Sequence, residues 1–295
     1  MQHILLTGAT GFLGSHLLEA LLKQGYKVTI LKRSTSDTWR IKQLLEQVST
    51  FDVDQVAIEE AFKADKVDVV IHTACSYGRN GQSLHEVAET NLMFGLKVLD
   101  AALRNSVSTF INTETFFNTN AVFSNYLSSY SLSKKQFSEW LKQSVSSIKV
   151  ISLNLQHVYG PKDDVSKFIP WLVHQLENGV ESISLTPGNQ IRDFVYVDDV
   201  VSAYMLMLSN AELLPRYSEF DVGTGELITV REFVETIYQA FQQKKHGNHT
   251  RLGFGEIPMR DGELLTVEVD NQALKKLGWT CRFTKEQGIK VLLGE

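Results

Sequence analysis

The stretch LLTGATGFLGSHLLEALLKQG, residues 5–25, places glycines at positions 8, 11 and 14 between an apolar run and an amphipathic segment. The run Ile4–Leu6 predicts a buried parallel strand, and the leucines that recur after Phe12 predict a helix that ends at Gly25. A glycine turn between strand and helix lets phosphates approach the backbone at the positive end of the helix. Glycines also serve plain tight turns, but the strand–turn–helix context favours a nucleotide-binding loop.

Composition excludes several classes of partner. The chain has 295 residues, 43% of them hydrophobic, and a net charge of −5, which argues against a nucleic-acid partner. No apolar run reaches the roughly 20 residues of a membrane span. The first strand begins at once, so we expect no signal peptide and a cytoplasmic location. We expect Cys75 and Cys281 to be buried and reduced, and the histidine spacing predicts no metal site.

Strand and helix patterns alternate through the first half of the chain, which predicts a doubly wound parallel Rossmann sheet in an α/β protein. The expected strands are 4–6, 28–31, 67–71, 109–112 and 150–153, and the expected helices are 12–24, 41–46, 56–62, 86–104, 132–143 and 168–177. We expect a dinucleotide-binding Rossmann domain at 1–163 plus 193–226. A smaller C-terminal α/β substrate-binding lobe would comprise 164–192 plus 227–295.

A second signal lies in YSLSKKQFSEWL, where Tyr130 and Lys134 are one helical turn apart. A lysine ammonium near a phenol lowers the pKa of the phenol and makes it a usable acid or base. An exposed helical pair would have the same spacing. Thr113 ends the strand TFINT, where its hydroxyl either binds a substrate oxygen beside Tyr130 or caps its own backbone.

Taken together, these residues resemble the extended short-chain dehydrogenase/reductase family of nucleotide-sugar-modifying enzymes. GATGFLG, VDVVIHTAC, HVYGP, RDFVYVDDVVSAY and the closing segment 259–279 resemble the family's motifs over nearly the whole chain. Within the family, segments 30–41, 112–118 and 130–137 are most similar to the CDP-abequose and CDP-paratose synthases, which reduce a 4-keto group.

The resemblance implies a set of site residues. Thr113, Tyr130 and Lys134 match the catalytic triad. The expected cofactor contacts are Gly8, Thr10, Gly11, Phe12, Leu13, Gly14, Lys32, Arg33, Ser34, Asp52, Val53, Thr73, Ala74, Asn91, Tyr130, Lys134 and His157. The expected substrate contacts are Ser76, Thr113, Asn154, Phe168, Arg192 and Arg260. The two arginines suit a diphosphate better than the alternative, a surface ion pair, whereas a hydrogen-bonded structural histidine explains His157 equally well.

The residues also favour one reaction over its relatives. Lys32, Arg33 and Ser34 follow the second strand where an acid would bind a ribose, so NADP(H) is favoured and NAD(H) stays open, unless these residues form only a solvated loop. The sequence Thr113-Glu114-Thr115 lacks the second acid that the family's dehydratases carry. We therefore expect NADPH-dependent reduction of a nucleotide-linked 4-keto deoxyhexose. A NAD-retaining epimerase and a catalytically silent nucleotide-binding protein are the alternatives. The resemblance also implies a homodimer through the helices at 86–104 and 132–143.

Overall fold

The computed structural model describes residues 2–79, 81–118, 127–245 and 249–295, and contacts divide the chain into two compact units. The first unit comprises Met1–Thr119, Leu127–Leu155 and Val201–Asp221. The second comprises Gln156–Val200 and Val222–Glu295. Residues 156–163, 193–200 and 222–226, which we expected in the dinucleotide-binding part, lie in the second unit by this criterion. The division into cofactor and substrate parts stays a prediction.

Within the described residues, the first unit is built on a seven-stranded sheet in the order β10-β6-β5-β4-β1-β2-β3. Its strands are β1 (His3–Thr7), β2 (Lys27–Lys32), β3 (Ser49–Asp52), β4 (Val69–His72), β5 (Thr109–Thr115), β6 (Lys149–Leu155) and β10 (Tyr217–Val222). Its helices are α1 (Phe12–Lys23), α2 (Glu59–Ala64), α3 (Leu84–Ala88), α4 (Phe94–Arg104), α5 (Ser128–Gln143) and α7 (Val197–Asn210), which continues from the second unit. The short turns η1 (Lys42–Gln47) and η3 (Phe116–Asn118) are 3₁₀ helices, and η2 (Glu89–Met93) is a π-helix.

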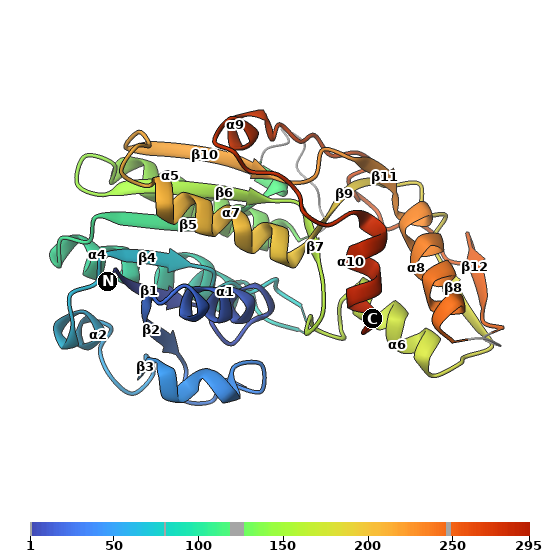
Figure 1. Cartoon of the computed structure of the whole chain (residues 1–295), viewed down its shortest axis with the longest axis horizontal. Coiled ribbons are helices and arrows are strands. Elements are labelled where there is room, and N and C mark those ends of the chain that lie inside the picture. The colour runs from blue at the N-terminus through green and yellow to red at the C-terminus, as the bar shows by residue number, and fades with distance from the viewer. Residues whose placement is uncertain (1, 80, 119–126, 246–248) are drawn as a thin grey trace. The chain divides into compact units, whose positions relative to one another are not determined.

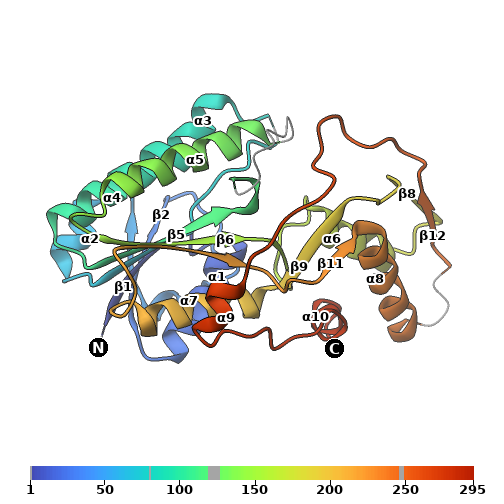
Figure 2. The ribbon, with the colours of Figure 1, turned by 90° about the horizontal axis from the view of Figure 1, so that it is seen from above.

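Helices cover both faces of this sheet, with α4 and α5 on one face and α1 and α7 on the other (Figures 1 and 2). The central strands β1 and β4 are buried along their whole length, as strands covered on both faces must be. The expected doubly wound parallel Rossmann sheet is confirmed. The strand order reverses between β1 and β4, and ligands of such sheets bind beyond the carboxyl ends at that point.

The sequence pattern failed in several places of this unit, and β10 and α7 were not predicted at all. The edge strand β3 was missed because its residues are exposed or half-exposed and give no apolar run. The segment 41–46 forms a 3₁₀ helix, and the expected single helix 86–104 is interrupted by η2. A π-turn interrupts a helix without changing its apolar periodicity, so sequence periodicity cannot show it.

The second unit contains two small sheets of described strands, ordered β11-β9-β7 and β12-β8. Its elements are β7 (His157–Tyr159), α6 (Phe168–Glu177), β8 (Ser182–Leu185), β9 (Ile191–Tyr196), β11 (Leu227–Thr229), α8 (Val230–Lys244), β12 (Arg251–Phe254), α9 (Gln272–Lys276) and α10 (Lys285–Leu292). Aromatic packing joins α8 to the first of these sheets, since Phe233 stacks on Phe194 with ring centroids 3.8 Å apart.

Candidate functional site

In the glycine loop after β1, close packing requires glycine at two of the three positions, Gly8 and Gly14. Gly8 has a φ of +72°, and a Cβ there would lie 2.6 Å from Thr73 Oγ1. A Cβ on Gly14 would lie 2.0 Å from Gly8 O, so only glycine lets α1 approach the loop this closely. Gly11 is exposed, and its Cβ would meet only Gly8 O, at 3.2 Å. Gly11 therefore leaves the outer side of the loop open to a ligand.

The start of α1 is suited to an anion. Its N-cap residue is Gly11, which offers no capping side chain, and its first turn contains no acid. The predicted contacts Thr10, Phe12 and Leu13 are half-buried at this turn. A cation lies close by, because the Arg40 guanidinium donates to Thr10 O over 3.3 Å. Arg40 was not among the predicted residues, since it is far from the loop in sequence.

The segment after β4, which contains the predicted cofactor contacts Thr73 and Ala74, lies against the end of β1 and the same loop. Thr73 Oγ1 donates to Thr7 O over 2.8 Å, and Ala74 N donates to Thr7 Oγ1 over 3.3 Å. The glycine loop and the end of β4 thus form one surface.

At the end of β2, carboxylates already engage two of the three residues predicted to hold a 2′-phosphate. Lys32 Nζ lies 2.5 Å from Asp52 Oδ1, and these residues are paired across β2 and β3. Asp54 accepts from both Ser34 N and Ser34 Oγ, at 2.7 and 2.5 Å, and these hydrogen bonds lower the pKa of Asp54 to about 2. Arg33 is exposed and Val53 is half-buried beside Asp52. The loop therefore carries charge of both signs.

Asn91 lies in the π-helix η2 and is fully buried. Its Oδ1 accepts from Ser76 N at 2.6 Å, and its Nδ2 donates to Ser76 O and Ser133 Oγ at 2.8 and 2.9 Å. Ser76 Oγ donates to Gln82 Oε1 over 2.6 Å. Asn91 thus connects the loop after β4 to α5. The polar side-chain atoms of both Asn91 and Ser76 are hydrogen-bonded within the protein.

The predicted pair Tyr130 and Lys134 lies on the buried side of α5, with 6% and 2% of their surfaces exposed. This excludes the exposed-pair interpretation. The ring of Tyr77, in the loop after β4, stacks on Tyr130 with centroids 4.8 Å apart, and the Arg79 guanidinium lies 5.3 Å from the Tyr77 ring. Tyr77 was missed because its contact with Tyr130 spans over fifty positions of sequence.

The expected lowering of the pKa of Tyr130 by Lys134 is not found. Burial raises the pKa of Tyr130 well above its usual value, and Tyr77, Cys75 and Glu114 act in the same direction. A hydrogen bond with Thr115 acts against the shift. Tyr130 is therefore a neutral phenol at physiological pH and is set up to donate a proton rather than accept one.

Thr113, which was expected to hold a substrate oxygen or to cap its own backbone, lies against a tyrosine of α7. The hydroxyls of Thr113 and Tyr204, on α7, are hydrogen-bonded at 2.6 Å. The side chain of Thr115, at the end of β5, acts to lower the pKa of Tyr130. Asn154, expected to contact substrate, is buried on β6 and donates to Glu219 and Asp221 at 2.9 and 3.0 Å. Thr115 was not predicted, and its sequence signal is a strand-end hydroxyl two positions after Thr113.

In the second unit, Arg192 is buried on β9. Its guanidinium donates to Ile191 O and Leu264 O at 2.9 and 2.6 Å and lies 3.6 Å from Glu263. It therefore anchors the segment that contains Arg260, which is itself exposed. The two predicted phosphate ligands belong to neighbouring parts of the second unit, and their role stays a prediction.

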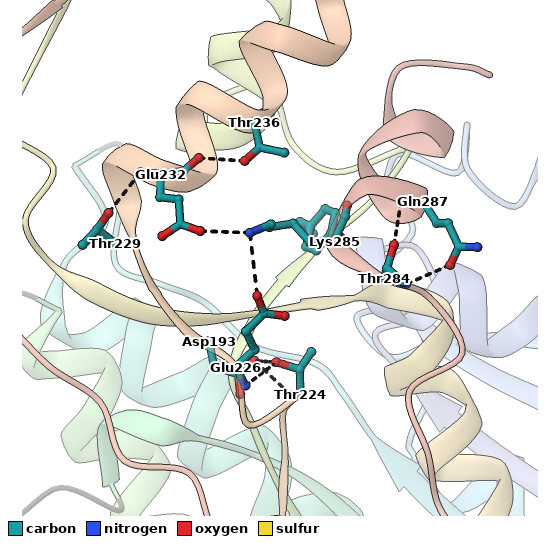
Figure 3. A network of polar contacts seen from close by, with 10 residues as sticks. Asp193, Thr224, Glu226, Thr229, Glu232, Thr236, Thr284, Lys285 and Gln287 are labelled. Carbon is teal, nitrogen blue, oxygen red and sulfur yellow. Dashed lines mark hydrogen bonds and ion pairs between the residues drawn. The ribbon is translucent and has the colours of Figure 1, made fainter.

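Two acids of the RDFVYVDDV motif, Asp193 and Asp199, accept hydrogen bonds from backbone groups of the second unit. Asp193 is fully buried and accepts from Thr224 N, Thr224 Oγ1 and Gly225 N at 2.7 to 2.9 Å (Figure 3). Asp199 accepts from Arg282 N at 2.8 Å. The motif therefore holds two loops against β9 and α7.

Figure 3 also shows Lys285, at the start of α10, between Glu226 and Glu232, with ion-pair distances of 3.7 and 3.0 Å. Lys285 and Glu226 line a cavity of about 290 Å³ whose walls include Tyr159, Tyr196 and Phe283. Lys285 is paired with two carboxylates, and Arg282 also lines this cavity.

Two further predicted residues, His157 and Phe168, lie in the second unit. His157 is half-buried on β7, and burial together with Arg192 lowers its pKa to about 3, so it is neutral. Phe168 is 41% exposed at the start of α6. The expectation of buried cysteines is wrong, because Cys75 is exposed and Cys281 half-buried. Cys75 follows the last strand residue of β4 by three positions, where the chain has already left the core.

A Rossmann sheet with an uncapped glycine loop and a buried Tyr–Lys pair defines a dinucleotide-dependent oxidoreductase fold. The NAD dependent epimerase/dehydratase family matches residues 4–223. The CDP-abequose synthase of Salmonella typhimurium is 32% identical over 294 residues, which is 99% of this chain and 97% of that protein. The UDP-glucose 4-epimerase of Thermus thermophilus, solved with NAD, has a TM-score of 0.80 at 25% identity and covers 99% of this chain and 98% of its own. The UDP-glucose 4-epimerase of Thermotoga maritima, solved with UDP-glucose, has a TM-score of 0.82 at 24% identity and covers 99% and 97%.

The chain belongs to the NAD dependent epimerase/dehydratase family. It is an NAD(P)-dependent enzyme that modifies nucleotide sugars. Among the described residues, no helix is both long and apolar enough to cross a membrane.

Proposed function

We propose that the protein reduces the 4-keto group of a CDP-linked deoxyhexose with NADPH, in dideoxysugar synthesis for a surface polysaccharide. The observation that carries the proposal is Tyr130, a buried neutral phenol one helical turn from the buried Lys134 on α5. The 32% identity to a CDP-abequose synthase supports the choice of nucleotide. Thr115 is followed by Phe116 and Phe117, which supply no acid or base for a dehydration.

The proposed mechanism assigns each residue one task. Bound NADPH supplies the hydride, and the glycine loop and the start of α1 hold its pyrophosphate. Tyr130 donates its proton to the carbonyl oxygen of the sugar as negative charge develops there, and Thr115 directs a hydrogen bond to the same oxygen. An alkoxide is far more basic than a phenolate, so this proton transfer is downhill even for a phenol of raised pKa. In the second unit, Arg192 and Arg260 bind the diphosphate.

The choice of NADPH rests on charge at the end of β2. Lys32, Arg33 and Arg40 are cations of this segment, and no acid follows β2 directly where it would select the ribose hydroxyls of NAD. One observation favours the alternative, a NAD-retaining epimerase. Asp52 neutralises Lys32 and Asp54 occupies Ser34, so a 2′-phosphate would face two carboxylates.

One preparation of the full chain tests both proposals. We expect the protein to consume one NADPH for each CDP-linked 4-keto deoxyhexose that it reduces. We also expect the freshly purified protein to carry little NAD. UDP-, dTDP- and GDP-linked analogues serve as controls for the nucleotide. Stoichiometric bound NAD, with interconversion of UDP-hexoses and no need for added reductant, would overturn the reductase and establish the epimerase.

We also propose that a second copy of the chain covers the helices α3 to α5. Leu84, Met93, Leu132 and Trp140 on these helices are between 43% and 75% exposed. Large exposed apolar side chains on neighbouring helices are typical of an interface. Light scattering tests this, since a dimer should become a monomer in a Leu132→Glu, Trp140→Glu variant.

A further inference from the structure

The ring of Tyr130 lies between two other aromatic rings of the first unit. Tyr77, in the loop after β4, stacks on it with ring centroids 4.8 Å apart and planes inclined by 30°. Phe117, in the turn η3, lies nearly perpendicular to it, with centroids 6.4 Å apart and planes at 86°. Aromatic pairs favour these two geometries. Packing from two directions therefore restricts the plane of the Tyr130 ring.

The loop that carries Tyr77 is fixed on both sides of this residue. Ser76 N donates to Asn91 Oδ1 at 2.6 Å, and Ser76 O accepts from Asn91 Nδ2 at 2.8 Å. Ser76 Oγ accepts from Gly78 N at 3.3 Å and donates to Gln82 Oε1 at 2.6 Å. Gly78 has a φ of +67°, which other residues rarely adopt. Both neighbours of Tyr77 in the chain thus hold its backbone in place.

A cation also packs against the Tyr77 ring. The guanidinium of Arg79 lies 5.3 Å from the ring centroid, and the Arg79 side chain is half-buried. Such a contact is favourable because the face of an aromatic ring carries partial negative charge. Asn91, which holds the same loop, belongs to the π-helix η2, and single π-turns within helices are frequent at functional sites. The loop therefore has more fixed contacts than a plain connection needs.

The direction in which a phenol donates its proton depends on the plane of its ring. Conjugation of the oxygen with the ring keeps the O–H bond in that plane. The χ2 torsion of tyrosine sets the plane, and its minima are broad, so the choice of rotamer alone does not fix it. Neighbouring side chains must do so. A proton donor needs the correct direction as well as the correct distance, and a misplacement of about 1 Å can cost on the order of a hundredfold in rate.

We propose that Tyr77 is a positioning residue whose ring fixes the plane of the Tyr130 ring and thereby the direction in which the Tyr130 hydroxyl donates. Tyr77 acts through Tyr130 and transfers no proton itself. Its ring is required for this task, and its hydroxyl is not. The inference rests on the proposed function, in which Tyr130 is the acid.

The first test compares Tyr77→Phe with Tyr77→Leu in the full chain. Phenylalanine keeps the ring and removes the hydroxyl, whereas leucine keeps apolar volume and removes the ring. With a CDP-linked 4-keto deoxyhexose, we expect Tyr77→Phe to keep kcat within about twofold and Tyr77→Leu to lower kcat at least about tenfold. The KM for the sugar nucleotide, the NADPH affinity and the thermal stability should stay near the wild-type values in both variants.

Tyr217→Leu is the matched control. Tyr217 on β10 is also a half-buried tyrosine with a cation over its ring, since Lys142 Nζ lies 5.8 Å from its centroid. This variant should keep the wild-type kcat. A loss in Tyr217→Leu as large as that in Tyr77→Leu would overturn the proposal, because the effect would then be general.

Two further outcomes would also overturn it. Equal losses of kcat in Tyr77→Phe and Tyr77→Leu would mean that the hydroxyl is required and not the ring. An unchanged kcat in Tyr77→Leu would mean that Tyr130 needs no such neighbour, and a raised KM beside it would make Tyr77 a substrate contact.

A second readout does not depend on turnover. In protein with ¹³C-labelled tyrosine rings, the resonances that disappear in Tyr130→Phe belong to Tyr130. The ring current of a ring stacked at 4.8 Å shields these nuclei, so they should shift downfield in Tyr77→Leu and stay in place in Tyr77→Phe. Unchanged Tyr130 resonances in Tyr77→Leu would refute the stack. Absence of NADPH consumption by the wild type, with the ring-current shift present, would instead refute only the proposed function.

Discussion

Two threonines on one strand make a sharp test of how the site is built. Thr113→Val and Thr115→Val each replace a hydroxyl by a methyl of similar size. Thr113 shares a 2.6 Å hydrogen bond with Tyr204, whose side chain is fully buried. Leaving the Tyr204 hydroxyl without a partner costs about 1–3 kcal/mol of unfolding free energy. We expect Thr113→Val to lower stability by that amount and to keep most of its activity.

Thr115→Val should behave in the opposite way. Its hydroxyl is next to the proton donor Tyr130, and loss of one such donor to a developing oxyanion costs on the order of 10²–10³ in kcat. Its contribution to stability is an ordinary hydrogen bond, about 0.5–1.5 kcal/mol. Chemical denaturation measures stability, NADPH consumption measures turnover, and NADPH binding to both variants is the control for an intact cofactor loop.

The two variants are therefore expected to have opposite effects: Thr113→Val chiefly lowers stability, and Thr115→Val chiefly lowers kcat. If Thr113→Val loses turnover by the larger factor while its stability is unchanged, Thr113 is the substrate-binding threonine and the reasoning from the Tyr130 hydrogen bond is refuted.

Three further outcomes follow from single contacts. Gly14→Ala would push a Cβ to 2.0 Å from Gly8 O, so it should cost about 1–3 kcal/mol of stability and weaken NAD(P) binding in calorimetry; normal binding would contradict the fit of the loop. Asp54→Asn removes an ionised carboxylate from Ser34, so NADP⁺ should bind severalfold tighter while NAD⁺ affinity stays the same; equal changes for both would show that the 2′-phosphate lies elsewhere. Burial lowers the pKa of His72 to about 3, so the unfolded chain binds this proton first and stability should fall as pH drops from 6.5 toward 3. Denaturation at several pH values measures how the free energy of unfolding depends on pH. In His72→Asn this slope should be smaller than in the wild type by up to about 1.4 kcal/mol per pH unit. An unchanged slope would mean that His72 is accessible to protons in the folded state.

Much of the fold could be predicted because its signals are local. The strand of residues 3–7, the glycine turn and the helix that follows are specified by neighbouring residues, since apolar periodicity and the φ of a glycine are properties of short segments. The same holds for the helical spacing of Tyr130 and Lys134. Strand β3 escaped prediction because an exposed edge strand needs no apolar run.

The remaining features depend on which segments meet in three dimensions. Adjacent strands set the register that places Glu114 beside Asn154, and packing of α5 against the sheet decides that Thr115 reaches Tyr130. The raised pKa of Tyr130 is likewise a consequence of burial by distant residues. The sequence by itself determined the parallel Rossmann sheet, the cofactor loop and the identity of the phenol–lysine pair. Only the tertiary structure decided the burial of that pair and the partner of Thr113 on α7, because hydrogen bonds and desolvation arise between segments that the chain brings together only on folding.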